Sequence, residues 1–499
     1  DGVDKMVNNP DPNVQLGSNY DQYDFAQKIM IKGETVNQTL NLQYSTSSDV
    51  LRYDRLTQLR KGAPRYAEWY YGPQERLFAS YKIDYKSDNK LFDRASLVTA
   101  YQKIQESRIT RNFNDSIKNH RIEDLDVMSF NLDFEKETER SEIRYGAEAY
   151  ANFVSSTAFT QSILDGTRGA LDTRYPDGGS KMMGAAAYFT QSWEIGQKKR
   201  WIISDGLRFS FVHLNARFID KSFFPFSFSE VNQNNPAVNG HLGAVFNANK
   251  KSRVSMNLST GFRAPNVDDL SKVFESTAGY VITPNPNLVA EYSYNAEVGY
   301  SHTFKEKFTL SGLVYGTILD NALSVQPSTF NGSDSIVYDD VKSAVATITN
   351  NSLATVTGFE GGFSGDLSEH YAVNGSITYT YGRIHQGDSI TPLDHVPPMF
   401  GRIGFIYKRK KFKTEIYSLF AGWKYKRDYN IQGEDNFANA TPEGMPAWST
   451  FNVRMNYQFA KWIGLQVACE NILDTNYRVF ASNISAPGRN FVLTLRTNF

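Results

Sequence analysis

Polar and apolar residues alternate with a period of two along most of this chain. Across residues 292–304, aromatic and aliphatic side chains occupy nearly every second position, and polar residues or glycine fill the positions between them. The same alternation recurs in the segments 128–135, 371–381, 451–459 and 463–469. Because successive side chains of a strand point to opposite faces of its sheet, this period predicts strands with one apolar and one polar face. Helical periodicity is nearly absent, so an all-β fold is expected.

The connections between these strands alternate in length. Short polar turns lie near residues 88, 138, 198, 251, 306, 410 and 460. Long segments occupy residues 47–75, 107–121, 156–182, 218–239, 262–290, 320–355, 383–398, 426–447 and 473–487. A soluble sandwich or propeller can also alternate, but short turns at one end and long loops at the other are the layout of a bacterial outer-membrane barrel. We therefore interpret residues 1–499 as a single transmembrane antiparallel β-barrel.

Hydropathy and composition agree with this interpretation. The mean hydropathy of −0.46 suits a soluble protein, but barrel strands show only alternate residues to lipid, so their average is low. The sequence has no apolar run of the about 18–20 residues that a membrane-spanning helix needs. The 53 basic residues balance 53 acidic ones, which argues against nucleic-acid binding through bulk charge. Cys469 is the single cysteine, so no internal disulfide is possible, and no Cys/His pair has zinc-ligand spacing. No cofactor is predicted.

The number of candidate strands is informative. We count about nineteen, whereas single-chain bacterial barrels have an even number because both ends lie on the periplasmic side. The last strand follows a long loop and ends at Phe499, which places that end in the periplasm. The first strand, near residues 20–31, then runs inward, and residues 1–18 become the remnant of an extracellular loop. We therefore expect further barrel strands before Asp1, and a signal peptide, which the sequence also lacks.

Several short motifs resemble those of TonB-dependent outer-membrane receptors. Residues 487–499 alternate and end on Phe499, a terminus that resembles the signal read by the barrel-assembly machinery. ENILDTNY at 470–477 resembles the penultimate-strand motif of this family, and GFRAPN at 261–266 and NPNL at 285–288 resemble two of its boxes. The segment 52–76, RYDRLTQLRKGAPRYAEWYYGPQER, is similar to receptors of the Bacteroidota type.

This resemblance implies a 22-stranded barrel around an N-terminal plug domain, as in the large plugged outer-membrane transporters. It also implies an outer-membrane protein of a Gram-negative bacterium, embedded in outer-membrane lipid, that binds a small-molecule ligand outside the cell. TonB and its inner-membrane motor would then pull the plug to admit the ligand. On this basis the plug and about three strands are missing from the chain, since about nineteen strands are recognised in it. A surface lipoprotein is a further possible partner.

One long loop combines aromatic rings with cations. Its rings are Tyr66, Trp69, Tyr70 and Tyr71, and its cations are Arg60, Lys61 and Arg65. Such a set can hold a flat, apolar or anionic ligand by stacking and charge. The alternative is that the rings belong to the aromatic girdle of the barrel or pack the loop on itself.

The two family boxes contain further candidate ligand-binding residues. Arg263 follows a strand and precedes Pro265, so its charge could face the ligand, or it could pair with Asp268 or Asp269 and anchor the loop. Asn285 and Asn287 flank Pro286 and either contact ligand or shape the turn before the next strand.

Two histidines share another long loop. His385 and His395 could ligate haem or a metal, since imidazole suits iron, but two histidines ten residues apart are better explained as ordinary solvated loop residues. In haem receptors of this family a histidine lies between the two boxes, and residues 265–285 contain none.

The sequence therefore predicts a receptor that imports a scarce ligand, first an iron–siderophore complex, then cobalamin, haem, oligosaccharide or peptide. A passive porin-like channel and a surface adhesin are the alternatives from other classes. Enzyme motifs such as G-x-S-x-G, H-E-x-x-H and the glycine-rich phosphate loop are absent from the sequence, so no catalysis is expected.

Overall fold

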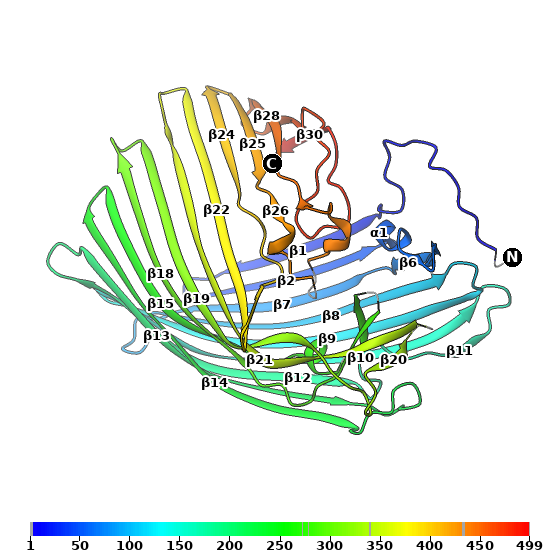
Figure 1. The fold of residues 1–499 in the computed structure, drawn as a ribbon. Coiled ribbons are helices and arrows are strands. Elements are labelled where there is room, and N and C mark those ends of the chain that lie inside the picture. The colour runs from blue at the N-terminus through cyan, green and yellow to red at the C-terminus, as the bar shows by residue number, and fades with distance from the viewer. Residues whose placement is uncertain (1–2, 272, 278, 339–340, 432–434, 499) are drawn as a thin grey trace.

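The computed structural model describes residues 3–271, 273–277, 279–338, 341–431 and 435–498. Its regular structure is almost entirely β, and long strands pair antiparallel into one curved sheet (Figure 1). In the order in which each pairs with the next, the long strands are β1 (Gln22–Lys32), β2 (Val36–Ser47), β7 (Glu75–Lys86), β8 (Arg94–Asn112), β9 (Ile117–Glu137), β10 (Ser141–Ser162), β12 (Ser180–Ile195), β13 (Trp201–Arg217), β14 (Glu230–Asn249), β15 (Ser252–Arg263), β18 (Glu291–Phe304), β19 (Phe308–Pro327), β21 (Val341–Asp366), β22 (Tyr371–Gln386), β24 (Phe400–Arg409), β25 (Phe412–Ala421), β28 (Trp448–Ala460), β29 (Ile463–Glu470) and β30 (Asn490–Thr497). The expectation of an all-β fold is confirmed.

Short elements lie in the long connections between these strands. They are β3 (Val50–Leu51), α1 (Tyr53–Leu56), β4 (Leu59–Arg60), β5 (Ala63–Pro64), β6 (Tyr66–Tyr71), β11 (Arg168–Ala170), α2 (Val267–Ser271), β16 (Phe274–Thr277), β17 (Tyr280–Thr283), β20 (Ser335–Tyr338), β23 (Ser389–Pro392), β26 (Lys424–Tyr425), η1 (Lys426–Asp428), η2 (Phe437–Asn439) and β27 (Gly444–Met445). Within the described residues, no helix is long and apolar enough to cross a membrane.

The predicted alternation of short and long connections is present, but strands extend into some of the predicted long loops. The segment 107–121 was expected to be a long loop, but β8 continues to Asn112 and β9 begins at Ile117. Strand also takes up much of the predicted loop at 320–355, since β19 extends to Pro327 and β21 begins at Val341. In the 107–121 segment both faces of the strands carry polar residues, so the period of two disappears from the sequence although backbone pairing continues.

The two faces of the sheet differ in polarity, as the alternation predicts. On β13, Leu207, Phe209 and Phe211 point to one side and are 55%, 59% and 46% exposed. Leu214 points to the opposite side and is fully buried. The polar face carries paired charges such as Arg208 with Glu148. A row of large apolar side chains this exposed is unfavourable in water and suits contact with lipid.

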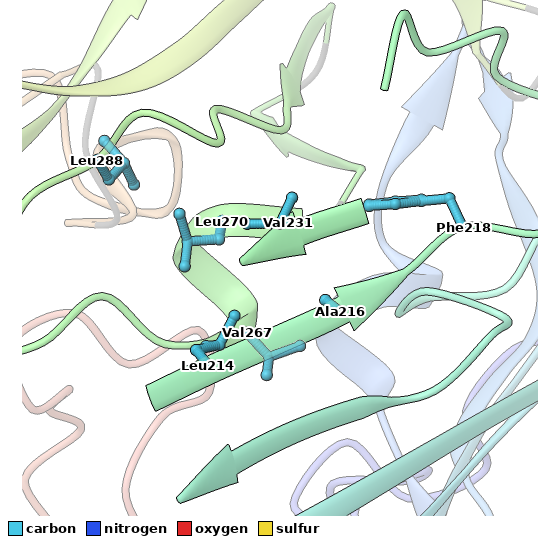
Figure 2. Close-up of a cluster of buried hydrophobic side chains, with 7 residues drawn as sticks. All are labelled: Leu214, Ala216, Phe218, Val231, Val267, Leu270 and Leu288. Atoms are coloured by element: carbon cyan, nitrogen blue, oxygen red, sulfur yellow. The ribbon is translucent and has the colours of Figure 1, made fainter. Parts of the chain in front are cut away.

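The inner face holds a buried apolar core that fixes the 264–290 connection. Figure 2 shows Val267 and Leu270 of α2 beside Leu214 of β13 and Val231 of β14, and these side chains belong to one buried cluster with Leu288. All of them are less than 10% exposed. The connection is therefore packed against the inner wall instead of projecting away from it.

The sheet ends on two strands that each have one partner. In the described part of the chain, β1 pairs only with β2, and β30 pairs only with β29. Loops from the two ends of the chain nevertheless meet, because Asn483 Nδ2 donates a hydrogen bond to Asp54 Oδ2 at 3.2 Å. Residues separated by more than four hundred positions thus lie side by side at the rim that carries the long loops.

Candidate ligand-binding site

The 48–74 connection folds back onto the sheet through β6. This strand pairs with the end of β8, which sets Trp69 opposite Thr110 and Tyr71 opposite Arg108. Because side chains alternate along a strand, Trp69 and Tyr71 share one face and Tyr70 points to the other. Arg108 and Glu106 point to the same face of β8. Arg121 and Glu123 lie opposite them on β9, so this polar face of the sheet continues across both strands.

Trp69 and Tyr71 are surrounded by three guanidinium groups. The two rings lie edge to face with centroids 5.0 Å apart. The Cζ atoms of Arg52 and Arg108 are each 5.3 Å from the Trp69 ring, and that of Arg55 is 5.5 Å away. Arg52 and Arg108 also lie 5.5 Å and 5.7 Å from the Tyr71 ring. We call these five residues the arginine–aromatic cluster.

The rings hold the guanidinium groups in place, and Trp69 has little surface left for a ligand. Trp69 is only 6% exposed, so most of its ring is covered by the protein. Cation–π contacts orient a guanidinium over the ring face but do not neutralise its charge. Stacking of a flat ligand on Trp69, one of the two modes predicted for this loop, is therefore not what the geometry favours.

One carboxylate neutralises part of the cluster. Arg52 binds Asp54 with both ends of its guanidinium, Nε to Oδ1 at 2.8 Å and Nη2 to Oδ2 at 2.7 Å. Arg52 Nη1 also donates to the Tyr71 hydroxyl at 3.1 Å, while Arg55 Nε lies 3.8 Å from Asp54 Oδ2. Burial alone would raise the pKa of Asp54, but the hydrogen bonds and charge of Arg52, with Asn483 and Arg55, hold it below its ordinary value.

More charged groups lie on the wall beside the cluster. Arg174 Nη1 donates to Glu106 Oε1 at 3.2 Å, and Arg121 Nη2 donates to Asp172 Oδ1 at 2.8 Å. Buried Nε atoms of Arg55, Arg108 and Arg174 have no hydrogen-bond acceptor in the described residues. Burial also raises the pKa of the neighbouring Tyr175 hydroxyl, which therefore stays protonated.

The other residues predicted in this loop lie outside the cluster. Tyr70 faces Lys118, whose Nζ is 5.9 Å from the ring centroid, and Tyr66 has Arg65 at 4.9 Å. Arg60 and Lys61 belong to the β4–β5 hairpin, where Lys61 adopts a φ of 52°. The cations beside Trp69 are instead Arg52, Arg55 and Arg108, which the sequence did not single out. Arg52 and Arg55 are close in sequence, but only the pairing of β6 with β8 reveals Arg108.

Arg263 is an anchor for α2. Its Nη2 donates to Asp269 Oδ2 at 2.7 Å and Oδ1 at 2.9 Å, and its Nη1 donates to Glu291 Oε2 at 2.7 Å. Asn266 and Asp269 each accept a backbone N–H from the other, which closes the first turn of α2. Of the two roles predicted for Arg263, the pairing with an aspartate is the arrangement in the structure.

Asn285 and Asn287 form a tethered turn. Asn285 Oδ1 accepts the backbone N–H of Asn287 at 3.0 Å, and Asn285 Nδ2 donates to the Ile348 carbonyl at 2.8 Å. Gln233 on β14 donates to the carbonyls of Pro286 and Leu288 at 2.9 and 2.7 Å. These bonds carry the turn-shaping role predicted for the two asparagines.

His385 and His395 occupy different surroundings. His385 lies near the end of β22, where its Nε2 is 2.9 Å from Thr355 Oγ1. His395 lies beyond β23 with a φ of 59°, and its backbone N–H binds Asp435 Oδ1 at 2.7 Å. Within the described residues, no three His, Cys, Asp or Glu side chains are grouped as metal ligands. Phe499, the predicted assembly signal, lies outside the described residues.

Asp435 belongs to a buried junction between loops. It is 1% exposed and accepts the backbone N–H groups of His395 and Asn430. Lys424 nearby donates to the Val396 carbonyl at 2.6 Å. Burial raises the pKa of Asp435 and lowers that of Lys424, so it disfavours the carboxylate form of Asp435 and the ammonium form of Lys424. The junction ties the 387–399 and 422–447 connections together.

Comparison with known proteins identifies the fold and the family. A segment of 209 residues is 26% identical to "Probable hemoglobin and hemoglobin-haptoglobin-binding protein 4" of Haemophilus influenzae, covering 38% of this chain and 20% of that protein, well under two thirds of its length. The structure of "Copper transporter OprC" matches with a TM-score of 0.78 at 12% identity, covering 97% of this chain and 72% of that one. The siderophore receptor PirA from Acinetobacter baumannii matches with a TM-score of 0.70 at 14% identity over 97% and 72% of the two chains. At these identities the structural matches show the fold alone.

The family assignment rests on a match over most of the chain. The family described as "TonB dependent receptor-like, beta-barrel" matches residues 7–472. Its members lie in the Gram-negative outer membrane and are receptors and transporters, not enzymes. This chain belongs to the TonB-dependent receptor β-barrel family.

Proposed function

We propose that this chain is the ligand-capturing barrel of a TonB-dependent transporter and that its ligand is an iron–siderophore complex. The observation that carries the proposal is the arginine–aromatic cluster, whose Arg52 binds Asp54, the residue at which loops from both ends of the chain meet through Asn483. Siderophores hold iron through oxygen donors that are often anionic, and arginine is the side chain best suited to bind such groups.

The proposed mechanism requires a plug domain, further barrel strands and TonB in addition to the residues of this chain. A plug domain and the remaining strands of a 22-stranded barrel complete the lumen, and TonB with its inner-membrane motor moves the plug after loop capture. The single partners of β1 and β30 support further strands between them. Residues 1–18 are then an extracellular loop, and the Bacteroidota type and a surface lipoprotein partner belong to the same proposal.

Haem is the second candidate ligand. It is favoured by the likeness to a haemoglobin-binding protein of Haemophilus influenzae. His385 and His395 would be its candidate iron ligands, although the Nε2 atom of His385 is already hydrogen-bonded to Thr355 Oγ1. Cobalamin, an oligosaccharide or a peptide, and the functions of a porin-like channel or an adhesin, are outcomes of the test below.

The test is growth of a strain from which the complete gene is deleted. Under iron limitation, supplied ferric siderophores should restore growth only when the gene is returned, and growth with cobalamin should be unaffected by the deletion. Dependence on haemoglobin instead of siderophores would establish the haem alternative. Equal growth of deleted and complemented strains on every iron source would overturn iron import. Steady ion conductance of the complete protein in a planar bilayer would indicate a channel.

A further inference from the structure

Asp205 is a carboxylate on the apolar outer face of the sheet. Side chains alternate along β13, so Asp205 points to the same side as Leu207 and Ile203, its two outward neighbours on the strand. Leu242 lies opposite it on β14, and Gln191 lies opposite it on β12. The carboxylate is therefore bordered by apolar residues on three sides and by one amide on the fourth.

The amide is a modest partner for a negative charge. Gln191 Nε2 donates to both carboxylate oxygens of Asp205, at 3.2 Å each. Among the described residues, no Lys, Arg or His nitrogen lies within 4.0 Å of this carboxylate. Ionisable groups at membrane depth are costly and are retained where they meet an opposite charge or a polar partner. A cationic group from outside the chain would therefore stabilise Asp205.

An apolar groove begins beside Asp205 on the same outer face. Its volume is about 820 Å³, and Leu207 and Leu242, two of the neighbours of Asp205, are part of its wall. The floor of the groove is made of small residues: Gly240, Ala296 and Gly316. A Cβ at Gly316 would meet only Thr357 Cγ2, at 3.9 Å, among the described residues that are not its chain neighbours. The space above the floor is therefore open to another molecule.

The groove runs from Asp205 toward the middle of the strands. Residues paired directly across β13, β14, β15, β18 and β19 form one row: Asp205, Leu242, Leu258, Ala296 and Gly316. Asp205 is the fifth residue of β13 and Gly316 the ninth of β19, and both strands begin after a short turn.

The Asp205 end of this row lies near a membrane interface. Trp201 at the start of β13 and Trp193 on β12 are exposed on the same outer face, one row or two closer to the short turns. Tryptophan is enriched at membrane–water interfaces, and the short turns of such barrels are periplasmic. A lipid headgroup at this interface can therefore reach Asp205 while its acyl chain extends along the groove.

We infer that the groove binds one phospholipid whose headgroup carries a primary ammonium, as in phosphatidylethanolamine. The ammonium donates to the carboxylate of Asp205, and an acyl chain covers the small residues of the floor. Charge complementarity selects this occupant, because Asp205 repels a purely anionic headgroup and a quaternary ammonium has no N–H to donate. The inference depends on the lipid-facing surface of the barrel and not on the identity of the imported ligand.

Native mass spectrometry of the complete receptor in detergent measures this binding. The parent should bind added dioleoyl phosphatidylethanolamine roughly tenfold more tightly than dioleoyl phosphatidylglycerol or dioleoyl phosphatidylcholine. Asp205→Asn keeps the shape of the side chain but removes the charge, so it should abolish this preference. Asp126→Asn is the matched control, because Asp126 also points outward, on β9, but accepts a hydrogen bond from Tyr101 and lies outside the groove. The control should keep the preference of the parent.

A second pair of variants tests the groove itself. Gly316→Leu places a side chain in the open space above the floor and should weaken phosphatidylethanolamine binding roughly fivefold, because an acyl chain can no longer cover it. Gly312→Leu is the control, since Gly312 lies on the same strand and face outside the groove, where a Cβ would meet only the Glu360 carbonyl oxygen at 3.8 Å. The difference between heated and unheated migration on a denaturing gel checks that each variant contains a folded barrel.

Equal binding of phosphatidylethanolamine and phosphatidylglycerol by the parent would overturn the lipid site. An unchanged preference in Asp205→Asn, or equal losses in Gly316→Leu and Gly312→Leu, would do the same. A receptor dimer that forms without added lipid and is lost in Asp205→Asn would assign the groove to a second copy of the chain and also overturn the inference.

Discussion

Replacing Arg263 by methionine is expected to release α2 from the inner wall of the barrel. Arg263 donates three hydrogen bonds to Asp269 and Glu291, and it is the group that joins these two carboxylates. Methionine keeps much of the side-chain volume but removes the charge. The two carboxylates are then left close together in a region where both are largely covered, with side chains 12% and 9% exposed.

The size of the effect follows from this burial. Exposed ion pairs contribute about 0–1 kcal/mol, whereas removing one partner of a buried pair costs about 3–5 kcal/mol. The carboxylates are buried but the Arg263 side chain is 46% exposed, which places the expected cost at the lower end of the buried range. We therefore expect about 3 kcal/mol, which corresponds to a local opening constant raised roughly 150-fold.

Hydrogen–deuterium exchange of the peptide covering residues 264–271 is the measurement. Exchange through local opening should accelerate by about two orders of magnitude in Arg263→Met, since each 1.4 kcal/mol is tenfold. Arg253→Met is the control, because Arg253 lies on the same strand, β15, is exposed and has no ion pair in the described residues. Unchanged exchange in Arg263→Met together with a loss of ligand uptake would refute the anchoring role and favour direct contact with ligand.

The remaining predictions concern the membrane face, one loop carboxylate and one loop glycine. Val298→Arg on the apolar face of β18 should cost about 2–4 kcal/mol of folding free energy in lipid vesicles. Glu297→Arg on the lumen face should cost about 1 kcal/mol or less. Equal costs of the two substitutions would contradict the assigned faces. Because the pKa of Asp54 is lowered in the folded protein, its contribution to stability is complete above the ordinary value of about 3.9 and is lost as the pH falls through the lower folded value. Exchange of residues 53–56 should therefore rise below about pH 4 in the parent, and an identical rise in Asp54→Asn would count against this cause. Gly444→Ala should open the 422–447 connection to protease, because Gly444 has a φ of 117° and a Cβ there would lie 2.0 Å from the Lys424 carbonyl oxygen; unchanged cleavage would show that this loop adapts.

The strands could be predicted well because their signal is local. Each side chain of β18 or β28 points to a face set by its own position on the strand, so the alternation predicted both strands and their polarity. The prediction was wrong at 107–121, where polar residues on both faces hide the ends of β8 and β9. The short turns were found because charged residues interrupt the pattern at each of them.

The candidate site could be predicted only in part. The sequence predicted that aromatic rings including Trp69 and Tyr71 could hold a ligand together with cations, and it named Arg60, Lys61 and Arg65 because those lie nearby in the chain. The structure brings Arg108 beside them instead, through pairing between β6 and β8. For Arg263 the sequence left two roles open, and the position of Glu291 on the adjacent strand β18 favours the anchoring one.

The sequence by itself determined the all-β class, the two faces of the strands and the order of turns and loops, because these depend on residues that are neighbours along the chain. Tertiary structure decided which charges are paired and which are not. Asp54 reaches Asn483, Arg263 reaches Glu291, and Arg108 reaches Trp69 but no carboxylate in the described residues. Such contacts depend on strand register and loop packing between distant segments, and the energy of a charge depends on those surroundings and not on its place in the sequence.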